Sequence, residues 1–544
     1  MSGLRYQGHK NKIFLVASLV AFGAQAQGPS PGQIGDTLKK APELKLPQPA
    51  PEIRQQAAPT QAEDSAARKV VVKRFGFSGN TVYSSEQLAA VTQSFTGRPI
   101  SLMEIYDAAD AVAAFYVDHG YGLASVSVPA QKISDGSIQL EVSEGRINGI
   151  VVEGNDSYQA DHLRDYLGNI RSGTLYRGDS LDEGMRKLNQ LPGLKAKAII
   201  KPGELYGTSD IVIKTTEDPI SGSLVVDNYG RKDIGEFRFS AFAQLNNPSG
   251  VEDQLQVLGL HSANGLLNYV YANYSVPVNT DSTRLSLAYG HAQFDVLNVP
   301  VTGDNDSGKL MIEHSLFDNR RNSLVVNAGV SRTQTSADFS GAALNATSIT
   351  LFEVGGSYNH VYDNLAVSQV ISSITTDFSK QNPAALTPPP GQSVEGHQRL
   401  RWELDVQHLQ PLYHGLALLA RVNTVYSPDA LVDPQKFALG GPQSVRGFPA
   451  SEVRGDRGYL ASLTLMQPFM LRDVNLVGRA FADGGRVYNI NSPADTSLAS
   501  LGAGFDAQYQ RVSVKLDWSY PLGNHPSSDN RDHGRLFGSL AVAF

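Results

Sequence analysis

The chain has 544 residues, a formal net charge of −7 and no cysteine. This length allows several domains, and the lack of cysteine excludes disulfides, thiolate metal sites and cysteine nucleophiles. Lysine and arginine are scattered along the sequence, so the clustered positive charge of a nucleic-acid-binding protein is missing and no nucleic-acid partner is expected.

The first 26 residues have the ordered composition of a secretory signal peptide. A basic segment, residues 5–12, precedes a nearly continuous apolar segment, residues 13–22. Ala24-Gln25-Ala26 then offers the small-x-small pattern of a cleavage site. The sequence therefore predicts export, with Gln27 as the first residue of the mature protein.

Residues 27–68 form a lead rich in proline, alanine and glutamine. This composition cannot bury a core and is typical of a linker. Within the lead, Gln33–Lys40 is a candidate short helix that includes Ile34 and Leu38. Two glycines in and beside this stretch weaken the helix by about 1 kcal/mol each.

The sequence from residue 69 to residue 218 contains an internal repeat. The segment Gly79–Tyr83 returns as Gly154–Tyr158, and the same order of expected elements surrounds both copies. We therefore expect two modules, residues 69–146 and residues 147–218, each with the order β-α-α-β-β. Each is small for a domain but large enough to hold a core.

Each module is expected to begin with an apolar strand and to contain a capped second helix. The first strands are predicted at Val70–Val72 and Ile150–Val152. Capping boxes are predicted at Ser101 and Ser180, because each serine is followed three residues later by a glutamate and then by apolar residues at helical spacing.

From residue 219 to Phe544, apolar and polar residues alternate over short segments. In residues 511–520 every second side chain is apolar, and polar or charged side chains stand between them. A period of two gives a strand one apolar and one polar face. About sixteen such strands begin at Ile220, and no run of 18 apolar residues predicts a spanning helix. The pattern predicts an all-β transmembrane barrel with lipid outside and a wet lumen.

The predicted connections differ in length at the two ends of the barrel. One end has tight turns at residues 246–252, 279–281, 318–322, 362–364, 413–415, 471–473 and 510–511. The other end has longer segments, rich in glycine, proline and aspartate, at residues 298–307, 379–395, 427–458 and 523–534. Short periplasmic turns and long outer loops are the asymmetry of bacterial outer-membrane barrels.

Two motifs stand in the second half of the predicted barrel. The longest outer loop contains the sequence Val445-Arg446-Gly447-Phe448. A later strand contains Phe481, Asp483 and Gly484. Counting alternate faces along that strand assigns the small and apolar residues to the lipid side, so Phe481 and Asp483 are predicted to face the lumen.

The modules, the barrel and these motifs together resemble the POTRA-plus-barrel outer-membrane superfamily. Two modules, rather than one or five, resemble its two-partner secretion transporters, the TpsB family. Such proteins export large adhesins, haemolysins or contact-dependent toxins that carry an N-terminal secretion domain. The resemblance implies an outer-membrane protein with periplasmic modules, which recognises and exports one cognate exoprotein.

The resemblance also implies a lock between the long loop and the barrel wall. Arg446 would pair with Asp483, because a guanidinium fork matches a carboxylate with two parallel hydrogen bonds. Gly447 would let the loop tip turn tightly, and Phe448 would give the loop an apolar contact on the wall. The pair is expected to fix the loop and so to set the transport-competent state.

Further partners follow from the same resemblance. The sheet edges of the modules would take an extended client strand by main-chain pairing. In the family an N-terminal helix fills the pore at rest, and Gln33, Ile34 and Leu38 mark the candidate here. Phe544 matches the terminal signature that the barrel assembly machinery recognises. Outer-membrane lipid is the remaining partner, and a monomer is expected.

Enzymatic motifs are missing from the sequence. Gly303–Leu310 mimics a phosphate-binding loop but has leucine where serine or threonine binds magnesium, so a polar loop is predicted there. No catalytic residues, cofactor or metal are expected. Two alternatives remain open beside the export pore: a barrel assembly or insertion factor of the same superfamily, and a porin with periplasmic appendages.

Overall fold

The computed structural model describes residues 44, 53–55, 69–133, 135–280, 282–378, 399–490, 495–523, 525, 527–531 and 533–544. The predicted signal peptide and the candidate plug residues Gln33, Ile34 and Leu38 lie outside the described residues. Two compact units make up the chain. The barrel unit is built on Ile220–Pro248 and Asp253–Phe544, and the module unit on Pro49–Pro219 and Ser249–Glu252.

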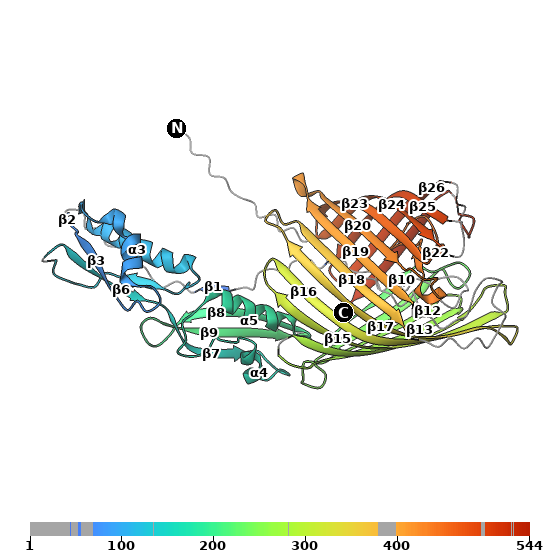
Figure 1. Cartoon of the computed structure of the whole chain (residues 1–544), viewed down its shortest axis with the longest axis horizontal. Coiled ribbons are helices and arrows are strands. Elements are labelled where there is room, and N and C mark those ends of the chain that lie inside the picture. The colour runs from blue at the N-terminus through green and yellow to red at the C-terminus, as the bar shows by residue number, and fades with distance from the viewer. Residues whose placement is uncertain are drawn as a thin grey trace. The chain divides into compact units, whose positions relative to one another are not determined.

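The barrel unit is one closed sheet of sixteen tilted antiparallel strands (Figure 1). The strands are β10 (Ile220–Asp227), β11 (Arg238–Asn246), β12 (Gln254–Ser262), β13 (Leu267–Pro277), β14 (Thr283–Asp295), β15 (Val301–Asp318), β16 (Asn322–Phe339), β17 (Ala342–Val361), β18 (Val367–Asp377), β19 (Leu400–Pro411), β20 (Ala417–Tyr426), β23 (Arg457–Leu471), β24 (Val474–Tyr488), β25 (Asp495–Tyr509), β26 (Val512–Leu522) and β27 (Arg535–Ala543). Successive strands pair, and β27 returns to β10. The predicted fold class is confirmed.

Strand β26 shows how alternation builds the wall. Trp518 and Tyr520 are 52% and 42% exposed on the outer face, whereas Asp517 and Ser519, which alternate with them, are buried on the inner face. A closed sheet pairs its backbone N–H and C=O groups between neighbouring strands, so such a wall can stand in hydrocarbon without water.

The last residues of the chain complete the closure of the barrel. The ladder between β27 and β10 runs from Ser223 opposite Ala543 to Asp227 opposite Ser539. Phe544 continues it, because its N–H donates to the carbonyl of Gly222 at 3.0 Å. A Cβ on Gly222 would lie 2.4 Å from the Phe544 ring, so the ring covers this glycine.

The connections at one end of the barrel are short, as the sequence predicts, and one of them contains η3 (Tyr413–Gly415). The loop predicted at residues 298–307 is wrong, because β15 begins at Val301 and pairs with both β14 and β16. Strands β15, β16 and β17 have 18, 18 and 20 residues, more than the roughly 9–11 that cross a membrane. We infer that their ends reach beyond the apolar band, where no apolar alternation marks a strand.

The first module contains β2 (Val70–Val71), β3 (Arg74–Ser78), α2 (Ser85–Val91), η2 (Gln93–Phe95), β4 (Pro99–Ile100), α3 (Leu102–Asp118), β5 (Ser125–Ser127) and β6 (Ser137–Ser143). Its sheet has the order β3-β6-β5. The strand predicted at Val70–Val72 is present as β2, but β2 pairs with β4 in a separate short ladder and does not join this sheet. The sheet strand is β3, which directs Phe75 into the core. The capping box at Ser101 is present at the start of α3.

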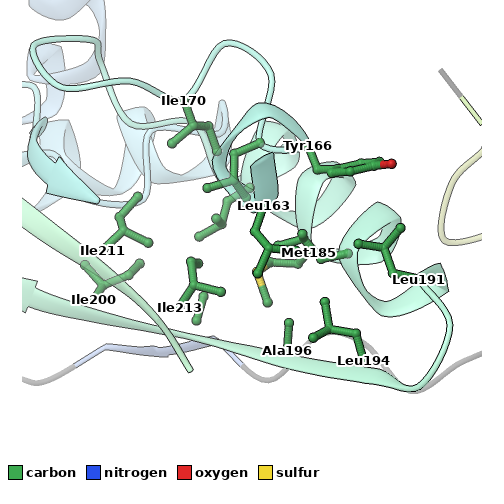
Figure 2. Close-up of a cluster of buried hydrophobic side chains, with 14 of the residues drawn as sticks. Leu163, Tyr166, Ile170, Met185, Leu191, Leu194, Ala196, Ile200, Ile211 and Ile213 are labelled. Atoms are coloured by element: carbon green, nitrogen blue, oxygen red, sulfur yellow. The ribbon is translucent and has the colours of Figure 1, made fainter. Parts of the chain in front are cut away.

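The second module contains β7 (Arg146–Glu153), α4 (Ala160–Asp165), α5 (Gly178–Gln190), β8 (Leu194–Pro202) and β9 (Thr208–Glu217). Figure 2 shows its core, where Leu163 and Met185 from the helices meet Ile213 from the sheet. The capping box at Ser180 is wrong. Helix α5 begins at Gly178, whose N–H donates to the carbonyl of Gly120 in the first module, so Ser180 lies inside the first turn.

A short segment of the lead joins the sheet of the second module. Strand β1 (Ile53–Gln55) runs parallel to β8, with Ile53 opposite Ala198 and Gln55 opposite Ile200. The sheet order is β1-β8-β9-β7. The composition of the lead predicts only a linker, and pairing by main-chain atoms explains why no apolar pattern announces this strand.

Candidate functional site: the L6 loop on the inner wall

The L6 loop, defined here as residues 427–456 between β20 and β23, folds back against the inner wall of the barrel. It carries η4 (Asp433–Gln435) and a two-stranded hairpin of β21 (Phe437–Leu439) and β22 (Val453–Gly455). The apolar side chains of this hairpin are buried against β20, β23, β24 and β25. The buried set is Val425, Phe437, Leu439, Val445, Phe448, Leu460, Val487 and Leu498.

Arg446 and Asp483 meet at the tip of the L6 loop. The Arg446 Nε and Nη2 atoms donate to the two Asp483 carboxylate oxygens, each at 2.7 Å. The backbone N–H of Arg446 donates to the same carboxylate at 3.2 Å. Both side chains are buried, with 9% of Arg446 and 0% of Asp483 exposed. We call this bidentate pair the L6 lock.

Hydroxyl groups of β23 complete the lock. Ser462 donates to Asp483 Oδ1 at 2.7 Å. The Arg446 Nη2 atom donates to Ser462 at 3.4 Å and to Thr464 at 3.3 Å. Removing a buried ion pair from water is unfavourable unless its remaining polar atoms find partners, and these two hydroxyls supply them.

Phe481 forms the floor of the lock. The Arg446 guanidinium lies 3.4 Å from the centroid of its ring, which adds a cation–π contact. The same ring covers Gly502, where an added Cβ would lie 2.3 Å from Phe481. A larger residue at position 502 would therefore displace the ring that contacts Arg446.

The glycines near the lock differ in what the structure requires of them. Gly447 has φ of 103°, and a Cβ there would stand 3.3 Å from Ser500. Gly485 faces Leu439 of the L6 loop, and a Cβ would come within 2.9 Å of that side chain. At Gly484, singled out in the sequence, a Cβ would make only an ordinary contact, 3.9 Å from the carbonyl oxygen of Leu498. Gly485 is therefore the glycine of β24 that lets the loop approach.

Sequence reasoning missed part of this site. Period-two alternation puts Ser462 and Thr464 on the inner face of β23. The register between β23 and β24 decides that Ser462 lies opposite Asp483 and Thr464 opposite Phe481. No single strand reveals that register. Gly502, two strands from the L6 loop in the sheet order, carries no local signal at all.

Neither metal nor helical membrane insertion is indicated in the described part of the chain. The described residues contain no group of three or more histidine, aspartate or glutamate side chains that could hold a metal ion. No helix among them is long and apolar enough to cross a membrane.

The fold and the site define an outer-membrane transporter of the POTRA-plus-barrel class. Its features are a closed barrel of sixteen strands, two repeated modules ahead of it, and a loop whose arginine binds the inner wall. Residues 207–507 match the family model described as haemolysin secretion/activation protein ShlB/FhaC/HecB, and residues 70–145 match the ShlB-type POTRA domain. The chain belongs to the haemolysin secretion/activation protein family.

Known relatives resemble the chain over most of its length. The outer membrane transporter CdiB of Escherichia coli O6:K15:H31 (strain 536 / UPEC) is 24% identical over 524 residues, which are 94% of this chain and 87% of that protein. The hemolysin transporter protein ShlB of Serratia marcescens is 26% identical, covering 83% and 82%. The solved structure of CdiB from Escherichia coli has the same fold, with a TM-score of 0.67, 22% identity and coverage of 90% and 93%.

Family membership settles the broad function. The protein is an outer-membrane transporter of the two-partner secretion type, with its POTRA modules in the periplasm, and it exports a protein. It is not an enzyme. The tight turns of the barrel are therefore its periplasmic end, and the L6 loop enters from the outer end.

Proposed function

We propose that this transporter serves one large cognate exoprotein with an N-terminal secretion domain, and that the L6 lock fixes the L6 loop in the position that sets the transport-competent state. The cargo class is an adhesin, a haemolysin or a contact-dependent toxin. One observation carries the proposal: a buried bidentate pair joins the tip of the L6 loop, at Arg446, to the wall, at Asp483.

The physical chemistry of the lock suits a two-state loop. Removing one partner of a buried ion pair typically costs about 3–5 kcal/mol, because the other charge stays buried without a partner. Separating the pair inside the protein would leave both charges in that state. A partly separated pair is therefore unfavourable, and the loop is either docked or well away from the wall. A passing client that displaces the loop must let water reach Arg446 and Asp483.

Client capture belongs to the sheet edges of the modules. An extended segment can add to such an edge through main-chain hydrogen bonds, with little demand on its side chains. The pairing of β1 with β8 shows that this edge accepts an extended segment of Ile53–Gln55. Client residues added to an edge of either module would use the same bonds.

Other partner assignments complete the proposal. The candidate plug Gln33–Lys40, which lies outside the described residues, would leave the pore before export. Phe544 presents the terminal signature to the barrel assembly machinery, in keeping with its 54% exposed side chain at the end of β27. The transporter works as a monomer, since the closed barrel of one chain contains the complete L6 lock.

A deletion strain tests the proposed function. Culture supernatant and cell-surface proteins are quantified from the deletion strain, from the same strain carrying the wild-type gene, and from the parent. We expect one large exoprotein to disappear and to return on complementation, while other outer-membrane proteins keep their levels.

The same experiment separates the alternatives. A broad fall in many outer-membrane barrels identifies an assembly factor and contradicts a dedicated exporter. Unchanged supernatant and surface fractions, together with a lower uptake of small solutes, identify a porin.

A further inference from the structure

The tip of the L6 loop lies across a straight row of inward side chains. Residues opposite one another on successive strands form this row, and the strand registers place them in the order Gln407, Arg421, Ser462, Asp483 and Ser500. Arg446 rests on Ser462 and Asp483, and Gly447 rests on Ser500. The L6 lock therefore covers the part of the row from Ser462 to Ser500, and Arg421 lies in the remaining part, next to Ser462.

Arg421 contacts the same loop three residues before the lock. Its Nη1 atom donates to the main-chain carbonyl of Gln443 at 3.2 Å. The guanidinium is held from behind by Asp405 on β19, which accepts from Nε at 2.9 Å and pairs with Nη2 at 2.8 Å. Gln407 donates to the other oxygen of Asp405 at 3.1 Å.

The burial of this group resembles that of the lock. The side chains of Arg421 and Asp405 are 18% and 3% exposed. A charge-assisted hydrogen bond is stronger than a neutral one, and water competes weakly at such a site. The contact with Gln443 is made to a backbone oxygen, so it does not depend on which side chain stands at position 443.

We propose that Arg421, positioned by Asp405, is a second anchor of the L6 loop. The two anchors grip the tip from strands on either side of β23, at Gln443 and at Arg446. With only one anchor the tip can swing about its remaining attachment. With both, it lies fixed along the row. Releasing the L6 lock alone therefore leaves the loop tethered, and full withdrawal requires the Arg421 bond to break as well.

This inference rests on the proposed function in one respect, that movement of the L6 loop controls export. Its test reads the loop directly and needs no cargo. The chain has no cysteine, so a single Val445→Cys substitution supplies a unique thiol. Val445 of the L6 loop is fully buried in the apolar cluster between the loop and the wall, and a membrane-impermeant maleimide should label Cys at this position slowly in intact cells.

The reporter is combined with each of five changes in the full-length protein. Arg421→Met removes the anchor, Arg421→Lys keeps its charge but loses the fork, and Asp405→Asn keeps the arginine but loosens its support. Arg401→Met is the matched control, because Arg401 is an inward arginine of β19 that pairs with Glu403 on its own strand. Arg446→Met reports on the lock itself.

We expect Arg421→Met to raise the labelling rate roughly tenfold, the loss of one hydrogen bond to a charged group, with smaller rises for Arg421→Lys and Asp405→Asn. Arg401→Met should change it less than twofold. If Arg421→Met lowers the amount of barrel in the membrane, Asp405→Asn carries the test, since it preserves side-chain volume.

The outcomes separate the anchor from the lock. An unchanged rate in Arg421→Met and Asp405→Asn, beside a faster rate in Arg446→Met, overturns the second anchor and leaves the lock standing. An unchanged rate in Arg446→Met overturns the lock instead. A rise in Arg401→Met equal to that in Arg421→Met means that the whole wall has loosened, which also overturns the anchor.

Discussion

The module unit and the barrel unit both hold a loop with a carboxylate, but with different donors. In the first module, Glu144 accepts from the backbone N–H groups of Thr81 and Val82 at 2.5 and 2.7 Å, and also from the Thr81 hydroxyl. In the second module, Glu217 accepts from the backbone N–H groups of Asp156 and Ser157. In the barrel, Asp483 accepts from the charged side chain of Arg446.

The difference in donors separates a permanent turn from a movable loop. The N–H groups that bind Glu144 and Glu217 are neutral, so opening either turn leaves no cation without a partner. Each turn begins at a glycine in the left-handed region, Gly79 with φ of 81° and Gly154 with φ of 83°. The L6 loop carries the cation of Arg446 at its tip, so opening the loop leaves both Arg446 and Asp483 without a charged partner. The barrel site is built to be wholly docked or wholly released.

The largest effect is expected when one charge of the L6 lock is removed. We expect Arg446→Ala or Asp483→Ala to leave a folded barrel but to lower export about tenfold or more, because the remaining buried charge is stranded and the loop loses its defined position. Exported protein is measured per molecule of transporter at the surface. Normal export at normal surface levels contradicts this.

A substitution in the first module tests the permanent turn. Burial opposes ionisation of Glu144, but the hydrogen bonds from Thr81 and Val82 outweigh it and lower the pKa of this carboxyl. Glu144→Gln should destabilise the module by about 1–3 kcal/mol at pH 7. Hydrogen exchange of the full-length protein measures the effect, and exposed Glu141→Gln on β6 is the control.

The pH dependence of that effect has a definite sign. Because the folded pKa is lowered, the stabilisation is fully present above the unfolded value of about 4.3. It is lost as the pH falls through the folded pKa, so the difference between wild type and Glu144→Gln should shrink below about pH 4. A difference that grows on acidification contradicts the assignment. Glu217→Gln should behave alike with a smaller amplitude, since its turn is more exposed.

A milder change tests the contact between Arg446 and the ring of Phe481. Phe481→Leu keeps an apolar floor but removes the ring face beneath Arg446, and we expect maleimide labelling of the Val445→Cys reporter to rise about two- to tenfold. Gly502→Ala should act in the same direction by displacing the ring. Equal labelling in both variants and the parent would remove Phe481 from the lock.

The smallest effect is expected at the end of the chain. Phe544→Ala should lower the amount of assembled barrel about twofold at low expression, because the ring covers Gly222 at the closure and ends the recognition signature. Leu540→Ala, also exposed on the outer face of β27, is the control. Equal barrel levels in the two variants would remove any special role of Phe544.

The sequence predicts what depends on local periodicity. Alternation along single strands gives the sixteen-stranded barrel and puts Asp483 on the inner face, and the serine and glutamate of Ser101–Glu104 give the start of α3. The prediction fails where a contact with a residue distant in the sequence determines the local structure. Helix α5 begins at Gly178 because of a bond to Gly120 in the other module, and no pattern around Ser180 contains that information.

The site divides in the same way. The tetrapeptide around Arg446 and the aspartate at position 483 stand out as motifs, yet Ser462 and Arg421 enter only through the registers of β20, β23 and β24. The polar continuation of β15 escapes detection because Thr302, Asp304 and Asp306 stand on its outer face, where apolar residues would mark a strand. Pairing, rather than composition, makes Gly303–Leu310 a strand.

A double-mutant cycle of export tests the central claim most directly. Export per surface transporter is measured for wild type, Arg446→Ala, Asp483→Ala and the double variant. If the two residues act as one lock, the double variant loses no more export than the worse single variant, because the second substitution removes a charge that the first has already stranded. Losses that multiply in the double variant would show two independent roles and contradict the lock.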